Sequence, residues 1–358
     1  MNIMIIRDEF KIHGPGLHAL KFGVELSKRG HKVVFCAASG ELDVEIRSYG
    51  MEKFTVEGLS FSGHRILNLV RNSTRIKKII KIERIDVVIG FNLLSTVSAY
   101  ISSFLSNKIN YIDIVVGEGK EKYLKFFPFK YVAISEYMMK RLMSFGISKD
   151  RLTVVYPSTI EIEQFDLCEK NRLAIRNEFD IKKEDILISS VAMFNRVTDN
   201  VSKGQDTIAK SIPTLVNQNP HIKFLFVGDG EKRKIIQESL IDYAENVRFA
   251  GKRSDVPSIM FASDIFCHFP DQETFGMVVT EAMAGKCPVV ARNIGGISNI
   301  VVNEETGYLV DSVEELIKRL LDLSNDSDLR KKMGNAGRIR VEEKYTLPRV
   351  IDVLEELF

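Results

Sequence analysis

The chain has 358 residues, 45% of them hydrophobic, and this length fits two domains of ordinary size. The longest apolar stretch, 85–105, is broken by Asp86, Asn92 and several serines and threonines, which argues against a membrane span. The four cysteines lie far apart, without a CxxC pair or nearby histidines, which argues against a disulfide framework and a zinc site. We therefore expect a cytoplasmic protein, and MNIMIIRDEF predicts a first strand, not a signal peptide.

Charge is distributed unevenly along the chain, although the formal net charge is only +2. Residues 1–160 contain 24 Lys and Arg against 15 Asp and Glu, or +9, and the remainder contains 26 against 33, or −7. A solvated imbalance explains this difference as well as two separate partners do. If partners explain it, the basic half is the better candidate for an anionic surface.

Short β-branched runs alternate with helical patterns in both halves of the chain. The runs NIMII, HKVVFCA, IDVVIG and INYIDIVV predict a parallel sheet with helices on both faces, and DILISSVAM restarts the same rhythm after an irregular stretch. We predict an α/β protein with two doubly wound, Rossmann-like domains, 1–165 and 180–342, that face a cleft. A helix at about 343–358 is expected to pack back on the first domain.

A glycine-rich segment, HGPGLHA, opens the first predicted helix with Gly14, Gly16 and Ala19. Seven residues separate it from the end of the first strand, whereas glycine follows the strand directly in a dinucleotide-binding fingerprint. A dinucleotide-dependent oxidoreductase is therefore the weaker alternative for this chain.

The segment 64–84 predicts an amphipathic basic helix, with an apolar stripe and Arg71, Arg75 and Lys78 on another face. The stripe can pack into the domain, or the basic face can lie on anionic lipid headgroups. The later segment YLKFFPFKYVA adds aromatic residues and lysines that suit a membrane interface.

Two glutamates flank a predicted strand-helix junction in the second domain. DIFCHF predicts a strand, the following loop contains Glu273, and GMVVTEAMA predicts a helix that contains Glu281. The first turn of such a helix leaves the N–H groups of Phe275 to Val278 without intrahelical partners, and Gly276 lets a ligand approach the backbone. This arrangement predicts a phosphate site with carboxylates that accept hydrogen bonds from sugar hydroxyls, and an ordinary surface joint is the alternative.

The passage resembles the donor-site signature of family 4 glycosyltransferases, which are retaining enzymes of the two-domain GT-B fold. The matching residues are Glu273, Phe275, Gly276, Glu281, Ala282, Met283, Ala284, Pro288, Val289 and Val290, followed by NIGGI and TGYLV. The resemblance spans most of the C-terminal half and is only architectural in the N-terminal half.

The resemblance implies a role for each matching residue. Glu281 would bind the nucleotide ribose, while Glu273 and the backbone of Phe275, Gly276, Met277 and Val278 would hold the donor sugar and distal phosphate. An Arg and a Lys-Gly would neutralise the pyrophosphate as the sugar leaves. Lys203-Gly204 matches this pair, and Arg196 is the arginine if the longer loop FNRVTDNVSKG returns it to the site.

Other positions follow from the same resemblance. Lys252 and Arg253 would lie near the base, and Gly14 and Gly16 would face the pyrophosphate and the acceptor. The stretch IDIVVGEGK lacks the histidine that many family members carry near the acceptor, so Asp113, Glu118, His13 and His18 are the candidates there. The remaining histidines, at 31, 64, 221 and 268, are expected to be structural or exposed.

The resulting hypothesis is a retaining hexosyl- or N-acetylhexosaminyl-transferase. It would move a sugar from a UDP-sugar or another nucleotide-sugar to a hydroxyl of a glycan or lipid-linked acceptor, in synthesis of cell-surface polysaccharide or glycoconjugate. We expect no cofactor, no metal and no nucleic-acid partner, and a peripheral position on the inner face of the plasma membrane. A nucleotide-sugar epimerase of the same architecture and an inactive sugar-binding module are the alternatives.

Overall fold

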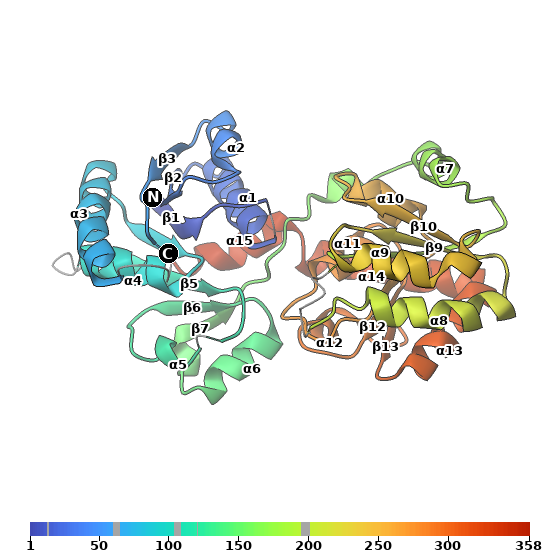
Figure 1. Cartoon of the computed structure of the whole chain (residues 1–358). Helices are drawn as coiled ribbons and strands as arrows, with labels where there is room; N and C mark the ends of the chain where they lie inside the picture. Colours follow the sequence, from blue (N-terminus) through green and yellow to red (C-terminus); the bar gives the residue numbers. More distant parts are fainter. Residues whose placement is uncertain (13, 60–64, 104–108, 120, 195–200) are drawn as a thin grey trace. The chain divides into compact units, whose positions relative to one another are not determined.

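The computed structural model describes residues 1–12, 14–59, 65–103, 109–119, 121–194 and 201–358; the side chains of 65–71 lie outside this description. The chain divides into two compact units, which are drawn in Figure 1. The first contains Met1–Thr159 together with Leu347–Phe358, and the second contains Ile160–Thr346.

The first unit contains a seven-stranded parallel sheet in the order β3-β2-β1-β4-β5-β6-β7. Its strands are β1 (Asn2–Glu9), β2 (Lys32–Ala38), β3 (Glu52–Thr55), β4 (Val87–Gly90), β5 (Asn110–Val115), β6 (Lys130–Ala133) and β7 (Leu152–Val154). The helices of this unit are α1 (Gly14–Lys28), α2 (Asp43–Ser48), α3 (Arg65–Glu83), α4 (Leu93–Ser102), α5 (Glu121–Leu124), α6 (Glu136–Ser144) and α15 (Leu347–Glu355).

The central strand β1 shows the burial on both faces that is typical of a parallel, doubly wound sheet. Residues 3–6 of β1 are fully buried, as expected for a strand covered on both faces. The strand order reverses at β1, between β2 on one side and β4 on the other, and ligands of such sheets bind beyond the carboxyl ends of the strands at that point.

The C-terminal helix α15 is part of the first unit and contacts α1. Arg29 donates from Nη1 to Asp352 Oδ1 at 2.8 Å and to Glu355 Oε2 at 2.6 Å. The structure differs from the single helix expected at about 343–358, because α14 continues to Lys344 and α15 begins at Leu347.

The second unit contains a six-stranded parallel sheet in the order β10-β9-β8-β11-β12-β13. Its strands are β8 (Ile186–Val191), β9 (Ile222–Val227), β10 (Val247–Gly251), β11 (Ile265–His268), β12 (Val289–Arg292) and β13 (Gly307–Val310). The helices are α7 (Glu169–Glu178), α8 (Gln205–Gln218), α9 (Lys232–Ser239), α10 (Val256–Ala262), α11 (Met277–Ala284), α12 (Ile297–Ile300), α13 (Val313–Asn325) and α14 (Ser327–Lys344).

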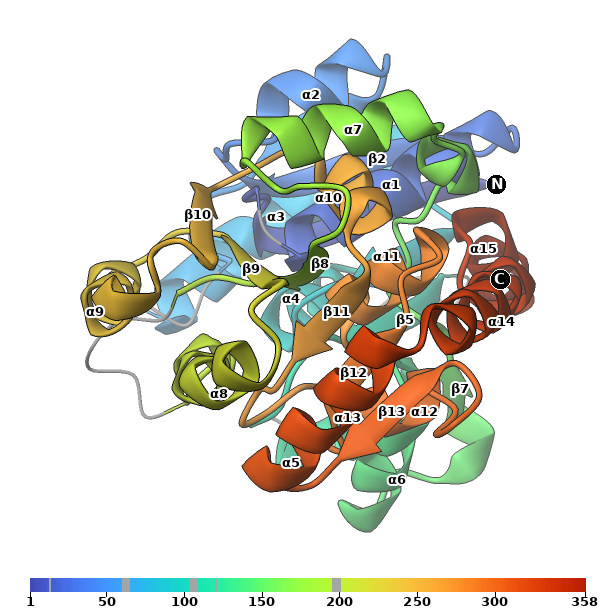
Figure 2. The same ribbon diagram turned by 90° about the vertical axis from the view of Figure 1, so that its right-hand side faces the viewer.

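Helices cover both faces of this second sheet. Figure 2 shows α8 and α13 on one face and α10, α11 and α14 toward the other. The core between the sheet and α8 contains Ile208 and Ile212 from α8, Leu316 and Leu320 from α13, and Phe224 from β9, all fully or almost fully buried. The predicted fold class is therefore confirmed: both units are doubly wound α/β domains built on parallel sheets.

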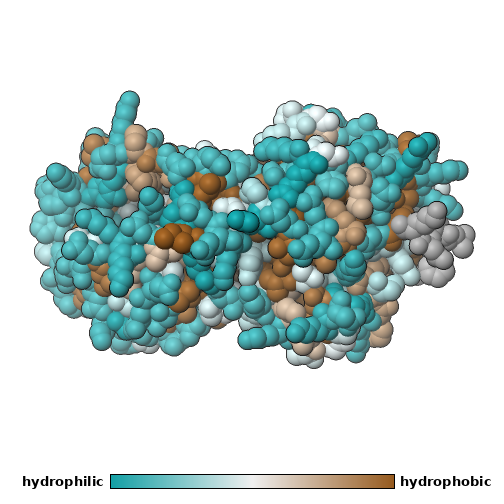
Figure 3. Space-filling model, turned by 180° about the vertical axis from the view of Figure 1, so that it is seen from behind, coloured by the Kyte–Doolittle hydropathy of each residue, from teal (hydrophilic) through white to brown (hydrophobic). Residues whose placement is uncertain are grey.

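The helices of the described ranges include no candidate for a membrane-spanning segment. None of the helices there combines the length and the apolar character that crossing a bilayer requires. On the face drawn in Figure 3, hydrophobic residues occur in small scattered groups within a mostly hydrophilic surface.

Candidate functional site

The junction between β11 and α11 contains a strand, a loop and a helix, as the sequence predicts. Gly276 precedes α11 with φ +111°, a conformation that L side chains rarely adopt, and a Cβ there would lie 3.2 Å from Ile297 Cγ1. Among the described residues, the N–H groups of Met277 and Val278 have no acceptor. The side chain of Phe275 is buried against Tyr345, so this residue can offer a ligand only its backbone. The start of α11 can therefore receive an anion.

Glu273 lies in the loop before α11 and contacts two side chains from other segments. Lys203 donates from Nζ to its Oε2 at 3.1 Å, and His268 Nε2 lies 3.7 Å from the same oxygen. Burial opposes ionisation of Glu273, but the interactions with His268 and Lys203 outweigh it and lower the pKa to about 2. Glu273 is therefore ionised at neutral pH and acts only as an acceptor.

Lys203 reaches Glu273 because the loop before α8 is fixed against the loop after β11. Gly204 has φ +95°, and a Cβ there would lie 2.2 Å from the carbonyl oxygen of Phe269. The N–H of Ser202 donates to Asp271 Oδ2 at 2.8 Å, and the N–H of Asp271 donates to the Ser202 carbonyl at 3.0 Å. The Lys-Gly of the sequence thus combines a cation with a glycine that close packing requires.

The NIGGI segment supports the same loop from its other side. The N–H of Gly296 donates to the Glu273 carbonyl at 3.0 Å. A Cβ on Gly295, which has φ +53°, would lie 1.8 Å from that carbonyl oxygen, and a Cβ on Gly296 would lie 2.5 Å from the Cα of Phe275. Both glycines therefore allow close packing that fixes the backbone of Glu273.

Glu281 lies on α11 itself and is half-buried. Its carboxylate has no hydrogen-bond or ion-pair partner among the residues that the structure describes. Burial raises its pKa to about 7, because the charged form loses solvation without gaining a partner. A ligand that donates hydroxyl groups would supply the missing hydrogen bonds.

The remaining residues predicted for the donor site, Lys252, Arg253 and Arg196, differ in their availability to a ligand. Lys252 is exposed beyond β10. Arg253 donates to Glu178 Oε1 at 2.5 Å and to Asp255 Oδ2 at 2.8 Å, and these carboxylates raise its pKa. Its guanidinium already pairs within the protein, so Lys252 is the better of the two candidates for a ligand. Arg196 lies outside the described residues.

The glycine-rich segment of the first unit begins α1 at Gly14. A Cβ on Gly16 would lie 1.9 Å from the carbonyl oxygen of Lys11, so the preceding loop packs directly on the first turn. His18 is buried, with its ring centroid 4.0 Å from that of Phe22 and 5.1 Å from that of Phe91. Burial and the charge of Arg7 lower the pKa of His18 to about 3, so its ring is neutral.

His13 lies outside the described residues, and the two acidic acceptor candidates have partners. Asp113 is buried on β5 and accepts a hydrogen bond from the Thr96 hydroxyl. Glu118 accepts from the Tyr137 hydroxyl at 2.8 Å, and Arg141 Nη2 lies 3.3 Å from its Oε2. Both nevertheless line a pocket of the first unit.

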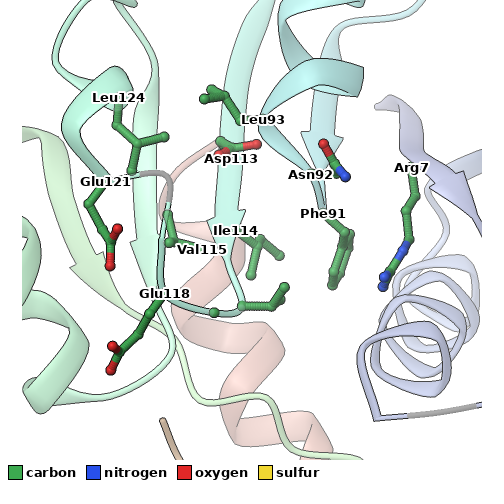
Figure 4. A pocket seen from close by; sticks show the side chains of 12 residues that line it. Arg7, Phe91, Asn92, Leu93, Asp113, Ile114, Val115, Glu118, Glu121 and Leu124 are labelled. Atoms are coloured by element: carbon green, nitrogen blue, oxygen red, sulfur yellow. The ribbon is translucent and has the colours of Figure 1, made fainter. Parts of the chain in front are cut away.

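This pocket lies beyond the carboxyl ends of β1, β4 and β5 and has a volume of about 170 Å³ (Figure 4). Arg7, Phe91 and Asn92 lie at one side of it, and Glu118 and Glu121 lie at the other. It therefore occupies the position beside the strand-order reversal at which doubly wound sheets bind ligands. Among the described residues, no group of three or more His, Cys, Asp and Glu is placed to hold a metal ion.

Two residues of these sites did not emerge from the sequence. His268, expected to be structural or exposed, is buried and neither ring nitrogen makes a hydrogen bond to a described residue, although Nε2 lies 3.7 Å from Glu273 Oε2. Arg7 lines the pocket of the first unit from near the end of β1. The only signal in the sequence is that each polar residue comes at the carboxyl end of a buried parallel strand.

Comparison with known proteins places this geometry in a family context. Residues 171–340 match the family model described as glycosyl transferases group 1. The chain is 20% identical over 374 residues to N-acetyl-alpha-D-glucosaminyl L-malate synthase of Bacillus anthracis, which covers 97% of this chain and 94% of that protein. It is 27% identical over 247 residues to the capsular polysaccharide biosynthesis glycosyltransferase CapM of Staphylococcus aureus, covering 66% of this chain and 63% of that one.

Solved structures agree on the fold. HepE of Anabaena, solved in complex with UDP, matches with a TM-score of 0.85 at 16% identity, covering 99% of both chains. The family description and the relatives' names support transfer of a sugar and give no support to the epimerase alternative. The chain therefore has the GT-B fold of two Rossmann-like domains, and the match of residues 171–340 to a glycosyltransferase family model supports a sugar-transferring enzyme.

Proposed function

We propose that the protein is a retaining, family 4-type glycosyltransferase whose second unit binds a nucleotide-sugar with UDP as the nucleotide. The observation that supports this best is the Lys203–Glu273 ion pair beside the start of α11. Glu281 lies on the same helix, and its carboxylate has no partner among the described residues. These groups offer a cation, free amides and two carboxylates, which suit a diphosphate flanked by two hydroxylated rings. The relative solved with UDP supports the choice of nucleotide.

In the proposed reaction, the bond between the sugar's anomeric carbon and the diphosphate breaks, a bond from that carbon to the acceptor's hydroxyl oxygen forms, and the hydroxyl proton passes to the leaving diphosphate, on which negative charge develops. Lys203 and the amides of Met277 and Val278 stabilise that charge without a metal. Glu273 remains ionised and accepts hydrogen bonds from donor-sugar hydroxyls, while Glu281 accepts from the ribose. Arg196 would add a second cation, and Lys252 would contact the base.

The acceptor in this proposal is a hydroxyl of a glycan or lipid-linked molecule, bound in the first unit. The similarity to a capsular polysaccharide glycosyltransferase favours a role in cell-surface polysaccharide or glycoconjugate synthesis. A thermal-shift screen with UDP, GDP, ADP and CMP and their sugars tests the donor, because a ligand that binds only the folded state raises the melting temperature with concentration. Binding of UDP-sugars alone supports the proposal; no shift with any of them contradicts it.

The affinity for UDP should increase with pH through the ionisation of Glu281. Ribose hydroxyls donate to the ionised carboxylate, so binding should release a proton from a group whose pKa is about 7. Between about pH 6 and 8 the Kd should fall by up to about tenfold. Isothermal titration in buffers of different ionisation enthalpy measures both the Kd and the proton release.

Glu281→Gln is the control for that experiment, because the terminal phosphate of UDP also titrates near pH 6. In the variant, the Kd for UDP should depend on pH only through ionisation of the terminal phosphate of UDP. Without UDP, the raised pKa makes wild type most stable below pH 4.5 and progressively less stable as the pH rises toward 7, so the variant should melt above wild type at about pH 8. Identical pH dependence of UDP binding in both proteins would contradict the assignment of Glu281.

We also propose that the basic face of α3 contacts an anionic membrane surface. Ile76, Ile79 and Ile80 are buried, so the described part of the apolar stripe packs into the unit, whereas Arg75 and Lys78 are exposed. Cations near such a surface each contribute about 1 kcal/mol. The double variant Arg75→Glu/Lys78→Glu should therefore co-sediment at least about tenfold less with phosphatidylglycerol vesicles at low salt.

The matched control for the membrane experiment reverses two exposed lysines of the second unit, Lys331 and Lys332. This control changes the net charge equally and should bind vesicles like wild type. Equal losses in both variants would indicate a general charge effect and not an α3 contact.

A further inference from the structure

We infer that the pocket of the first unit binds the acceptor through an anionic group, a carboxylate or a phosphate, that pairs with Arg7. This inference rests on the proposed function, since it names the chemical class of acceptor for that site. It depends on the charges that line the pocket and on which of them already have partners.

Arg7 is the group that an anion would satisfy. Its side chain is only 13% exposed, and its Nε donates to Asp8 Oδ1 at 3.1 Å. Its Nη1 is buried and has no hydrogen-bond partner among the described residues. An unsatisfied guanidinium N–H in a buried position is costly, and the planar fork of arginine fits carboxylate and phosphate oxygens.

The carboxylates that line the pocket are already engaged. Asp113 accepts from the Thr96 hydroxyl. Glu121 is buried and accepts from Arg141 Nε at 2.6 Å and from the Gly119 N–H at 2.7 Å. The third, Glu118, is held by a tyrosine and the same arginine. Arg7 is the one cationic side chain among the described residues that line the pocket.

The pocket is also polarised from one side to the other. Figure 4 shows Arg7 near Phe91 and Asn92, across the pocket from Glu118 and Glu121, with Ile114 and Val115 between them. Asn92 caps α4 by accepting from the Leu94 N–H at 3.0 Å, so the positive end of that helix lies on the Arg7 side. An anion is therefore favoured beside Arg7 and disfavoured beside the two glutamates.

His18, which the charge of Arg7 influences, does not provide a second positive charge for an anion. His18 packs on the same Phe91 ring, and its ring is neutral at physiological pH because burial and Arg7 disfavour the charged form. Among the described residues Arg7 thus pairs with Asp8 through Nε, while Nη1 has no hydrogen-bond partner, and the pocket's carboxylates Asp113, Glu118 and Glu121 are bonded to other groups.

The size of the pocket limits the acceptor further. The pocket has a volume of about 170 Å³. The group that enters it is therefore of the size of one sugar ring or a small hydroxy acid. The anionic group therefore belongs to the acceptor unit itself, as in a sugar acid, a hydroxy acid or a phosphorylated polyol.

Binding of matched charged and neutral compounds to the full chain tests the inference. The probes are glucuronate against glucose, glycerol 3-phosphate against glycerol, and malate against its diamide, titrated without donor. At least one anionic member should bind wild type about tenfold or more tightly than its neutral partner, as a charge-assisted pair predicts. Arg7→Met should remove that discrimination, Arg7→Lys should keep part of it, and the exposed control Arg47→Met should keep all of it.

The outcomes separate this inference from the proposed function. UDP should bind wild type and all three variants equally, because Arg7 is in the first unit and the proposed donor residues are in the second. Failure of UDP to bind wild type would contradict the proposed donor site and leave the anion site standing. The inference is overturned if no anionic probe binds better than its neutral partner, or if Arg7→Met discriminates as wild type does.

Discussion

Replacing Lys203 with methionine should lower kcat for sugar transfer by about 10²–10³-fold, the loss that follows removal of one group that stabilises developing charge. The Nζ of Lys203 lies 3.1 Å from Glu273 at the start of α11, where the proposed diphosphate would depart. The donor already carries negative charge in the ground state, so its KM should rise by less than kcat falls. Steady-state kinetics with the best donor of the thermal-shift screen measures both constants.

The control for this variant is Lys210→Met, which removes an exposed lysine from α8, the helix that follows Lys203. It should transfer sugar at the wild-type rate. Loss of Lys203 also removes one of the interactions that lower the pKa of Glu273, so the acid limb of the pH–rate profile should move upward in the variant. An unchanged kcat would remove Lys203 from the proposed mechanism.

The architecture was predictable because local sequence patterns determine it, whereas the donor-side loop was identified by its resemblance to a family signature. Buried parallel strands such as residues 3–6 of β1 are continuous apolar runs, and this pattern requires no knowledge of their neighbours. Gly204 and the NIGGI segment stand out in the sequence only through that resemblance, and the structure supplies the reason for these glycines, which is their close contacts with Phe269 and Glu273. Short strands such as β6 and β7 have fewer residues over which a pattern can repeat, and they were missed.

Pairings between distant segments could not be predicted in the same way. The resemblance suggests Arg253 for a contact with the base, but its guanidinium pairs with Glu178, which lies 75 residues earlier in the chain. Even the approach of His268 Nε2 to within 3.7 Å of Glu273 Oε2, only five residues later, depends on the path of the loop after β11, which a sequence pattern does not specify. Arg7 becomes a candidate ligand because the sheet order places β1 beside β4, which the alternation of strands and helices does not specify.

Glu273→Gln should separate donor binding from transfer more clearly than any other single change. The glutamine keeps the size of the side chain but removes a charge that is present throughout the physiological range, because the pKa of Glu273 is about 2. Transfer should fall by about 10²-fold or more, as for loss of one preorganised electrostatic contact to the reacting sugar. UDP should bind as well as or better than in wild type, because a negative charge near the phosphates is gone and Lys203 is released.

The change in UDP affinity distinguishes Glu273 from Glu281, the other glutamate of the proposed donor site. Glu281→Gln should weaken UDP binding at about pH 8, whereas Glu273→Gln should not. The lowered pKa of Glu273 also means that its ionised form stabilises the fold above pH 4.5 and that this contribution is lost as the pH falls toward 2. The melting temperatures of wild type and Glu273→Gln should therefore converge in acid.

Glu245→Gln, at an exposed position of the second unit, controls for the loss of one negative charge and should change neither constant. If Glu273→Gln weakened UDP binding and left the turnover of bound donor intact, Glu273 would be a nucleotide contact. The ion pair with Lys203 would then be a structural feature of the apo protein and not part of the reaction. Because the two interpretations predict opposite signs for the change in UDP affinity, one titration of each variant decides between them.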